Sequence, residues 1–131
     1  MIDYEVNIFD RVHRQASSKF AKGKLVSRYV ASPTAFPAGS LYELSNRTVR
    51  DLQSTSATEN FARIMYQLDV YAKTKAEAKA AYKAVDDEMI AMGFIRISGN
   101  LFDNPTSPDL FRYTARYEAY IDPEGIIHRV S

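Results

Sequence analysis

The sequence contains no cysteine and only two histidines, His13 and His128. Disulfides and thiolate zinc sites are therefore excluded, and the composition suits a reducing compartment. No second histidine, cysteine or carboxylate stands at ligand spacing beside His13, which falls within an apolar helical stripe. A core or boundary histidine is the ordinary interpretation of that position. We expect no metal ion and no cofactor.

Long hydrophobic runs, signal-peptide patterns and internal repeats are also missing. There is no glycine-rich nucleotide loop, no nucleophile elbow and no HExxH zinc motif, so no catalytic residue is predicted. The formal net charge is only +1, which gives no overall field that would attract nucleic acid or a membrane surface. These absences favour a protein that is not an enzyme and does not associate with membranes.

The size and composition are those of one globular domain. The chain has 131 residues, of which 46% are hydrophobic and 25% are charged. A chain of this length buries enough surface on folding to form a substantial core. We therefore expect a single domain over residues 1–131.

The clearest pattern is a strand over residues 61–71. Its residues alternate with period two, so that one set faces the core and the other faces solvent. The outward set combines Arg63, Gln67 and Asp69 with Phe61 and Met65. These two apolar residues are either scattered surface hydrophobes or a contact patch. The inward set is wholly apolar and consists of Ala62, Ile64, Tyr66, Leu68 and Val70.

A capped helix follows this strand directly. Thr74 is expected to be its N-cap, with Glu77 three residues on, a spacing at which both side chains can satisfy free backbone N–H groups. Gly93 stands where a helix ends in the left-handed conformation. The expected apolar stripe comprises Ala78, Ala81, Tyr82, Val85, Met89 and Met92. Alanines on the opposite face serve helix propensity alone or allow another subunit to approach closely.

The remaining elements follow from the same rules. Asp3 is expected to cap a first helix over residues 4–20. The polar segment 46–60 is predicted to be an extended loop or arm. The order α-β-β-β-α-β-β-β predicts an α+β domain, in which two helices pack on one face of a mainly antiparallel sheet. The first helix should bury Ile2, Val6, Phe9, His13, Ala16 and Phe20. The other strands should lie at 25–31, 41–44, 94–98, 111–121 and 126–130, and a further loop should cover 99–108.

Charge is asymmetric only locally. Every charged residue from Arg11 to Arg28 is basic, and Arg47 and Arg50 lie in the predicted arm. A solvated basic edge is the ordinary interpretation of the 11–28 segment, and contact with phosphates or with an acidic partner is the alternative.

Two further groups of side chains bear on catalysis. The carboxylates of residues 86–88 follow one another on a helix, where neighbours splay roughly 100° apart, so they are predicted to form a solvated acidic turn and not one site. Tyr66, Tyr113 and Tyr117 point inward and either line a small pocket or fill the core with their hydroxyl groups paired. A small hydrolase or isomerase using such a pocket is the enzymatic alternative.

Three stretches resemble a known family. They are residues 59–71, ENFARIMYQLDVY, residues 84–96, AVDDEMIAMGFIR, and residues 111–129, FRYTARYEAYIDPEGIIHR. In this order they resemble the tail completion or tail terminator proteins of long-tailed bacteriophages, small neck proteins of the head-to-tail junction. The resemblance implies an α+β fold and a hexameric ring that caps the tail tube and joins it to the head, without cofactor or catalysis.

The same resemblance implies partners and a location. The partners are further copies of the chain, the tail tube protein and the head–tail connector proteins, with weak contact to passing DNA, and the site is the virion's head–tail junction after assembly in the host cytoplasm. Another neck or head-closure protein, or a small nucleic-acid-binding module using residues 11–28, is the alternative. A head-to-tail ring uses two different contact surfaces. The candidate contact residues are Arg47, Arg50, Phe61, Met65, Ala76, Ala80, Ala84, Asn100 and Asn104.

Overall fold

A computed structural model describes residues 3–20, 25–27, 37–48, 61–103 and 111–128. These residues form two α-helices, a short 3-10 helix and six strands. The elements are α1 (Glu5–Ala16), η1 (Ser17–Lys19), β1 (Leu25–Val26), β2 (Ala38–Thr48), β3 (Ala62–Ala72), α2 (Lys75–Met92), β4 (Ile95–Asp103), β5 (Phe111–Ile121) and β6 (Ile127–His128).

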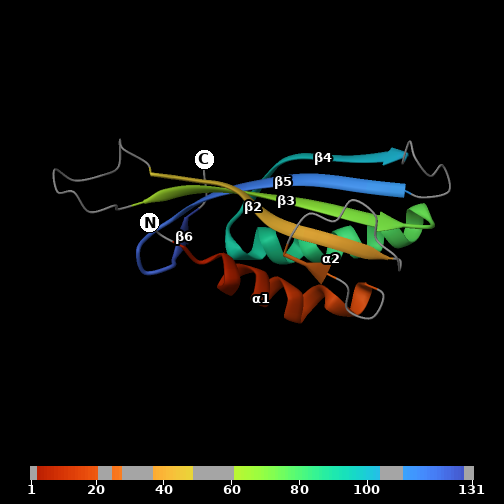
Figure 1. Cartoon of the computed structure of the whole chain (residues 1–131), viewed down its shortest axis with the longest axis horizontal. Helices are drawn as coiled ribbons and strands as arrows, with labels where there is room; N and C mark the ends of the chain where they lie inside the picture. The colour runs from red at the N-terminus through yellow and green to blue at the C-terminus, as the bar shows by residue number, and fades with distance from the viewer. Residues whose placement is uncertain (1–2, 21–24, 28–36, 49–60, 104–110, 129–131) are drawn as a thin grey trace.

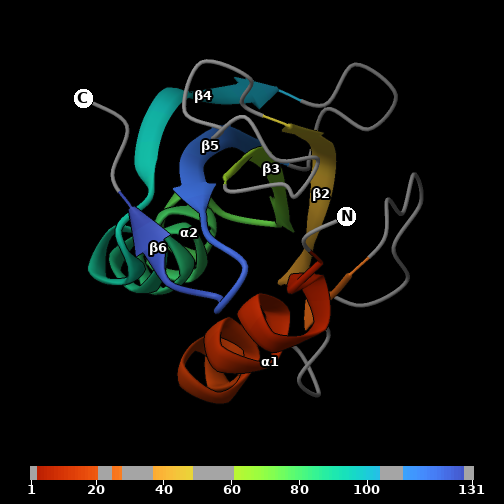
Figure 2. The same ribbon diagram turned by 90° about the vertical axis from the view of Figure 1, so that its left-hand side faces the viewer.

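The strands form one sheet in the order β1-β2-β3-β5-β4, and β6 pairs with β5. Only the short β1–β2 contact is parallel, and the other described pairings are antiparallel. Both helices lie on the same side of the curled sheet (Figures 1 and 2). The predicted α+β fold, with its order of elements and its mainly antiparallel sheet, is confirmed.

Strand β3 lies at the centre of the sheet, between β2 and β5. Its predicted inward set packs under the helices, with no member more than 1% exposed. The inward residues of β5 that oppose this set are buried from Ala115 to Ile121, whereas Phe111 and Tyr113 are half-buried. The core therefore lies between the central strands and the apolar faces of the two helices.

Helix α2 begins and ends as its sequence predicts. The Thr74 side chain accepts a hydrogen bond from the Glu77 backbone N–H at 3.1 Å. Gly93 terminates the helix with φ 114°, a conformation that costs residues with a Cβ atom more than it costs glycine. Every residue of the predicted stripe is buried, so α2 contributes one continuous apolar face to the core.

The apolar stripe predicted for the first helix is confirmed at Ala16 and Phe20, which are buried, but the beginning of α1 turns a different face to the core. Val6, expected in the core, is 71% exposed, while Ile8 and Val12 are buried with Ala16. The N-cap position is Tyr4, not Asp3, although the Asp3 carboxylate does accept the Glu5 N–H at 3.2 Å. Two apolar rows run along this helix, so periodicity alone did not select between them.

The beginning of α1 makes a hydrogen bond to a residue that is far away in the sequence. The Tyr4 hydroxyl donates to the Pro123 carbonyl at 2.8 Å, which joins the beginning of α1 to the turn after β5. Phe9 and His13 are half-buried, with ring centroids 5.6 Å apart. Ile2 lies outside the described residues.

Two strands are longer than predicted because each contains a β-bulge. The register shifts between Glu43 and Ser45 in β2 and between Arg96 and Ser98 in β4. A bulge reverses the alternation beyond it, so the period-two pattern is interrupted although the strand continues. The predicted arm at 46–60 thus begins inside β2, with 49–60 outside the described residues, and the predicted loop at 99–108 begins inside β4, with 104–108 outside.

The two short strands also differ from prediction. β1 covers Leu25–Val26 only, and β6 covers Ile127–His128. Residues 28–31 and 129–130 of the predicted strands lie outside the described residues. Between β5 and β6 the Asp122 carboxylate accepts the backbone N–H groups of Glu124 and Ile126, each at 2.9 Å, which holds the predicted turn.

The cap of α2 allows a direct test of its contribution. Thr74→Ala removes the side-chain acceptor of the Glu77 N–H, and we expect the free energy of unfolding to fall by about 1 kcal/mol. Thr74→Ser keeps an acceptor in place and should lie much closer to the wild type. Urea denaturation of the three proteins measures the difference, and equal stability of the alanine and serine variants would contradict a capping role.

Candidate interaction surfaces

The side of the sheet away from the helices, here called the outer face, is made of polar and charged side chains. The registers of β2, β3 and β5 place cross-strand partners on the same face, opposite the buried set. Its described cross-strand rows are Arg47–Arg63–Tyr120, Ser45–Met65–Glu118, Tyr42–Gln67–Arg116, Ser40–Asp69–Thr114 and Ala38–Tyr71–Arg112.

One half of the outer face is organised around a buried carboxylate. Asp69 is 0% exposed and accepts hydrogen bonds from the Thr114 hydroxyl at 2.8 Å and from the Arg112 guanidinium at 3.2 Å. The Gln67 amide and the Tyr42 hydroxyl also donate to it, at 3.2 and 3.3 Å. A buried charge persists only when it is paired and hydrogen-bonded, as Asp69 is here.

The expectation that the outward residues of β3 are solvated is therefore wrong for part of the strand. Gln67 is 8% exposed, Asp69 0% and Tyr71 4%. Arg112 lies 5.9 Å from the centroid of the Tyr71 ring, so its guanidinium contacts both an aromatic face and a carboxylate. This half of the outer face is a polar layer built into the fold.

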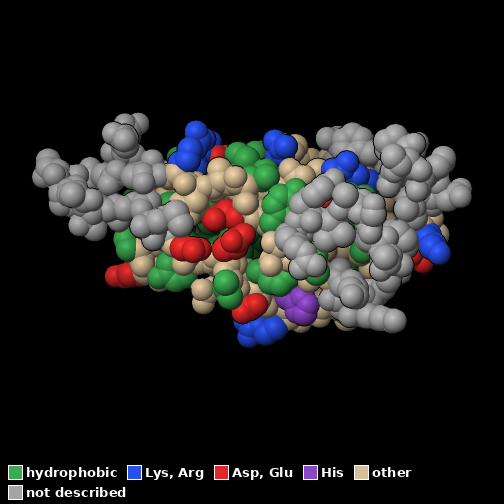
Figure 3. Space-filling model, in the orientation of Figure 1, with side chains coloured by type: hydrophobic (Ala, Val, Ile, Leu, Met, Phe, Trp, Pro, Cys, Tyr) green, Lys and Arg blue, Asp and Glu red, His purple; other side chains and the backbone are tan. Residues whose placement is uncertain are grey.

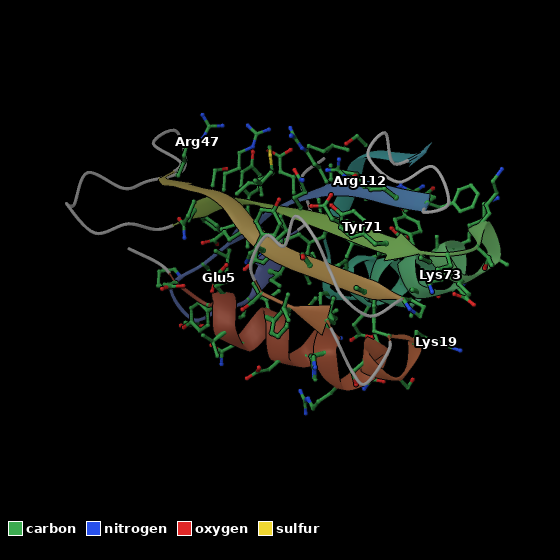
Figure 4. The ribbon with its side chains drawn as sticks, turned by 45° about the vertical axis from the view of Figure 1, so that its right-hand side comes forward. Glu5, Lys19, Arg47, Tyr71, Lys73 and Arg112 are labelled. Carbon is green, nitrogen blue, oxygen red and sulfur yellow. The ribbon has the colours of Figure 1, made fainter. Side chains whose placement is uncertain are left out.

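The other half of the outer face carries two arginines side by side. Arg47 of β2 is the cross-strand partner of Arg63 of β3. Arg63 is bonded to Glu118, whereas Arg47 is exposed and makes no hydrogen bond or ion pair within the described part of the chain. Like charges directly opposite each other on a sheet are unfavourable. Figure 4 shows Arg47 on the side of the sheet away from α1, and in Figure 3 Lys and Arg side chains follow the same upper edge.

Carboxylates gather on the opposite side of the sheet, where α1 begins. Glu43 is the cross-strand partner of Tyr66, so its side chain faces the helices. The Glu5 carboxylate accepts the Glu43 backbone N–H at 3.0 Å. Burial first, and then the charges of Glu5 and Asp3, raises the pKa of Glu43 to about 7. Asp3, Glu5 and Glu43 are called the acidic cluster below, and Figure 3 shows acidic side chains together over β2 and the beginning of α1.

A buried hydroxyl lies next to the acidic cluster. Tyr66 is 0% exposed, and its hydroxyl has no hydrogen-bond partner among the described residues. Burial raises its pKa, and Glu43, Glu5 and Asp3 raise it further, in that order. The expectation of paired core hydroxyls is confirmed for Tyr117, which donates to Asp86 at 2.7 Å, and is wrong for Tyr66.

The consecutive carboxylates of α2 bind separate partners, as their splay predicts. Asp86 accepts from Tyr117 and, at 3.3 Å, from Tyr82 and Arg96. Asp87 pairs with Lys83, and Glu88 pairs with Arg11 of α1, both at 2.8 Å. The interpretation as a solvated acidic turn is wrong for two of them, because the side chains of Asp86 and Glu88 are only 17% and 19% exposed.

The alanine face of α2 is only partly exposed to solvent. Ala76 and Ala80 are exposed, whereas Ala84 is half-buried and packs against the core. Ala84 stands one helical turn before Glu88, which bonds Arg11, so this side of α2 faces α1. A substitution at Ala84 would therefore perturb the packing of the monomer as well as any contact between subunits.

Other predicted contact residues are dispersed. Met65 is half-buried on the outer face, and Phe61 is half-buried with its ring edge-on to His128 at 5.4 Å. Asn100 lies within β4 and not in a loop. Arg50 and Asn104 lie outside the described residues. The structure thus places Arg47 and Met65 on one face with Arg63, a residue that sequence reasoning did not select.

The described residues of the basic segment 11–28 do not share a surface with Arg47. Arg11 is ion-paired with Glu88 between the two helices, and Arg14 and Lys19 are exposed on the helix layer. Figure 4 shows Lys19 and Arg47 on opposite sides of the sheet and at opposite ends. Lys22, Lys24 and Arg28 lie outside the described residues. The described cations of this segment therefore form no single groove with Arg47.

Within the ranges that the structure describes, no group of histidine and acidic side chains could hold a metal ion. None of the described helices is long and apolar enough to cross a membrane.

Comparison with known proteins gives a likeness of fold. No family model matches the chain, and no curated protein matches it. Among solved structures, a chain of the "Virion of native gene transfer agent (GTA) particle" is similar, with a TM-score of 0.61 and 16% sequence identity. The match covers 86% of this chain and 92% of that chain. At this identity the likeness establishes a shared fold.

Loss of the Asp69 charge tests the polar layer of the outer face. Asp69→Asn keeps the side-chain shape but removes the carboxylate that Arg112 bonds. It also places an amide NH₂ group, a hydrogen-bond donor, next to groups that donate to Asp69. We expect the free energy of unfolding to fall by about 3 kcal/mol. Asp87→Asn is the matched control, since it breaks an exposed pair and should cost at most about 0.5 kcal/mol. Equal effects in a urea titration would contradict the assigned role.

The acidic cluster predicts a pH dependence. The pKa of Glu43 rises from its ordinary 4.5 to about 7, so the folded protein binds more protons than the unfolded chain between these values. This stabilisation is complete below about pH 4.5 and is lost as the pH rises through 7. We expect the free energy of unfolding to fall over this range in the wild type and to fall less in Glu43→Gln. Parallel profiles of the two proteins would contradict this.

Proposed function

We propose that this protein is a structural component of a phage or phage-like virion, and that it acts as a ring-forming tail terminator or tail completion protein. The observation that carries the proposal is the fold shared with a chain of the gene transfer agent virion, which extends over most of both chains. The three stretches that resemble tail terminator proteins support it independently, and their described residues include most of β3, the second half of α2 and the whole of β5.

In this role the protein forms a hexameric ring that caps the tail tube and joins it to the head. Its partners are other copies of itself, the tail tube protein and the head–tail connector proteins, and its place is the head–tail junction after assembly in the host cytoplasm. Weak contact with passing DNA is part of the proposed role. The role requires no catalysis and no cofactor.

The surfaces suit a head-to-tail ring. Such a ring needs two unlike patches on each subunit, because the patch on one copy meets a different patch on the next. The outer face ends in arginines at the β2–β3 row, while the acidic cluster occupies the other side of the same end. Another neck or head-closure protein would use the same kind of ring, and the position within the neck distinguishes the two.

Native mass spectrometry over a wide range of concentrations tests the proposal. We expect a hexamer, or a monomer–hexamer series, and closed rings in negative-stain electron micrographs. Adding tail tubes of the parent particle should increase the ring fraction and place rings at the tube ends. A strict monomer at every concentration, with tubes present as well as absent, would contradict the proposal.

A further inference from the structure

Two clusters of opposite charge lie on the two sides of the sheet at the same end. Arg47 and Arg63 form one cross-strand row on the outer face. The acidic cluster lies below β2, where Glu5 begins α1, as Figure 4 shows for Glu5 and Arg47. Side chains on opposite faces of one sheet cannot reach each other, so neither cluster can neutralise the other within one copy.

The arginine cluster carries an unbalanced charge. The described outer-face rows contain four arginines, Arg47, Arg63, Arg112 and Arg116, and two carboxylates, Asp69 and Glu118, which leaves two positive charges in excess. Asp69 bonds Arg112 and Glu118 bonds Arg63. Among the described residues, Arg116 donates only to the neutral Gln67, at 3.2 Å. Arg47 is exposed beside a second guanidinium, which costs free energy unless an anion covers it.

The acidic cluster carries an excess of negative charge. No lysine or arginine of the described residues forms an ion pair with any of its three carboxylates. Glu43 is half-buried among like charges, and the fully buried Tyr66 hydroxyl beneath it has no described partner. A cation placed against the cluster would favour the charged form of Glu43 and offset its loss of solvent.

We propose that the outer face of one copy docks on the acidic cluster of the next, with Arg47 and Arg63 against Asp3, Glu5 and Glu43. The contact rests on the proposed ring-forming function and names its two surfaces. It is heterologous, the type of contact that generates a ring when the rotation between copies closes. Apolar area is available on the outer face, because Met65, two residues from Arg63, is half-buried.

A second copy accounts for both clusters, whereas nucleic acid accounts for one. A phosphate backbone would cover the arginines, but it would leave the acidic cluster uncompensated and be repelled by it at the same end of the molecule. The chain's net charge of +1 also gives no general attraction for a polyanion. Copy-to-copy contact neutralises each cluster with the other and leaves the total charge unchanged.

Charge reversal on each side tests the contact. Arg47→Glu reverses the exposed arginine, and Asp3→Lys reverses the exposed member of the acidic cluster. We expect each variant alone to need a concentration about tenfold or more above that of the wild type for half-assembly, measured by native mass spectrometry and light scattering. Circular dichroism melting of both variants at dilution establishes that the monomer remains folded.

An equimolar mixture of the two variants is the decisive sample. Where the two variants meet, the carboxylate introduced by Arg47→Glu lies against the ammonium group introduced by Asp3→Lys, and the unchanged surfaces of the two variants match each other. An alternating ring with an even number of subunits then has only complementary contacts, so mixing should restore assembly close to the wild-type concentration. Arg14→Glu and Asp10→Lys, which make the same changes at exposed positions of α1, are the matched controls and should assemble normally.

The outcomes separate the contact from the proposed function. A wild type that never assembles overturns both. If the wild type forms rings and Arg47→Glu and Asp3→Lys assemble equally well, the ring stands and the two surfaces are wrongly assigned. If Arg47→Glu assembles normally but loses salt-sensitive binding to double-stranded DNA, the arginines serve nucleic acid and the copy-to-copy contact is overturned. Failure of the mixture to assemble also overturns it.

Discussion

The antiparallel pairing of β3 with its two neighbours determines where the charges of the sheet lie. Every residue of β3 has a partner in β5, from Ala62 with Ile121 to Ala72 with Phe111. Because side chains alternate between faces, this register assigns each residue of the neighbouring strands to the helix side or to the outer face. A slip of one residue would put Arg63 and Asp69 under the helices. The register therefore underlies both the core and the separation of the charged clusters.

Three carboxylates of the fold are shielded from solvent, and their surroundings differ. Asp69 is surrounded by four donors from β2, β3 and β5, and Asp86 accepts from two tyrosines and an arginine. Both are integrated into the packing of the monomer. Glu43 instead faces two other carboxylates, and its pKa is raised to about 7. A local conflict of this kind, in a fold that otherwise satisfies its buried charges, is typical of a functional surface.

The likeness of fold and the surfaces contribute differently to the functional argument. One fold supports many functions, so the match to a virion chain at 16% identity indicates an architecture, and a function must be argued from this chain's own side chains. Those side chains provide two unlike charged patches on opposite sides of one end of the sheet. Unlike patches favour head-to-tail contact, the arrangement that a ring-forming virion component requires.

Short-range physics made much of the fold predictable. The alternation of β3, the Thr74 cap, the α2 stripe and Gly93 all depend on residues a few positions apart, and the structure confirms each of them. The correct face of α1 was not predictable in this way. The face that α1 buries occurs together with long-range contacts, such as the hydrogen bond between Tyr4 and Pro123, which are 119 residues apart.

The candidate site was predictable only in part. Arg47 and Met65 were selected from the sequence, whereas Arg63, Glu5 and Glu43 were not, because their roles arise from cross-strand partners and from the docking of α1 on β2. The bulge after Glu43 also reverses the alternation in β2, so no periodicity indicates that Arg47 and Glu43 face opposite ways. The sequence by itself determined the elements, their order and the central core, since these follow from local spacing. Only the tertiary structure decided which charges meet, because register and bulges bring together residues that are distant in the chain.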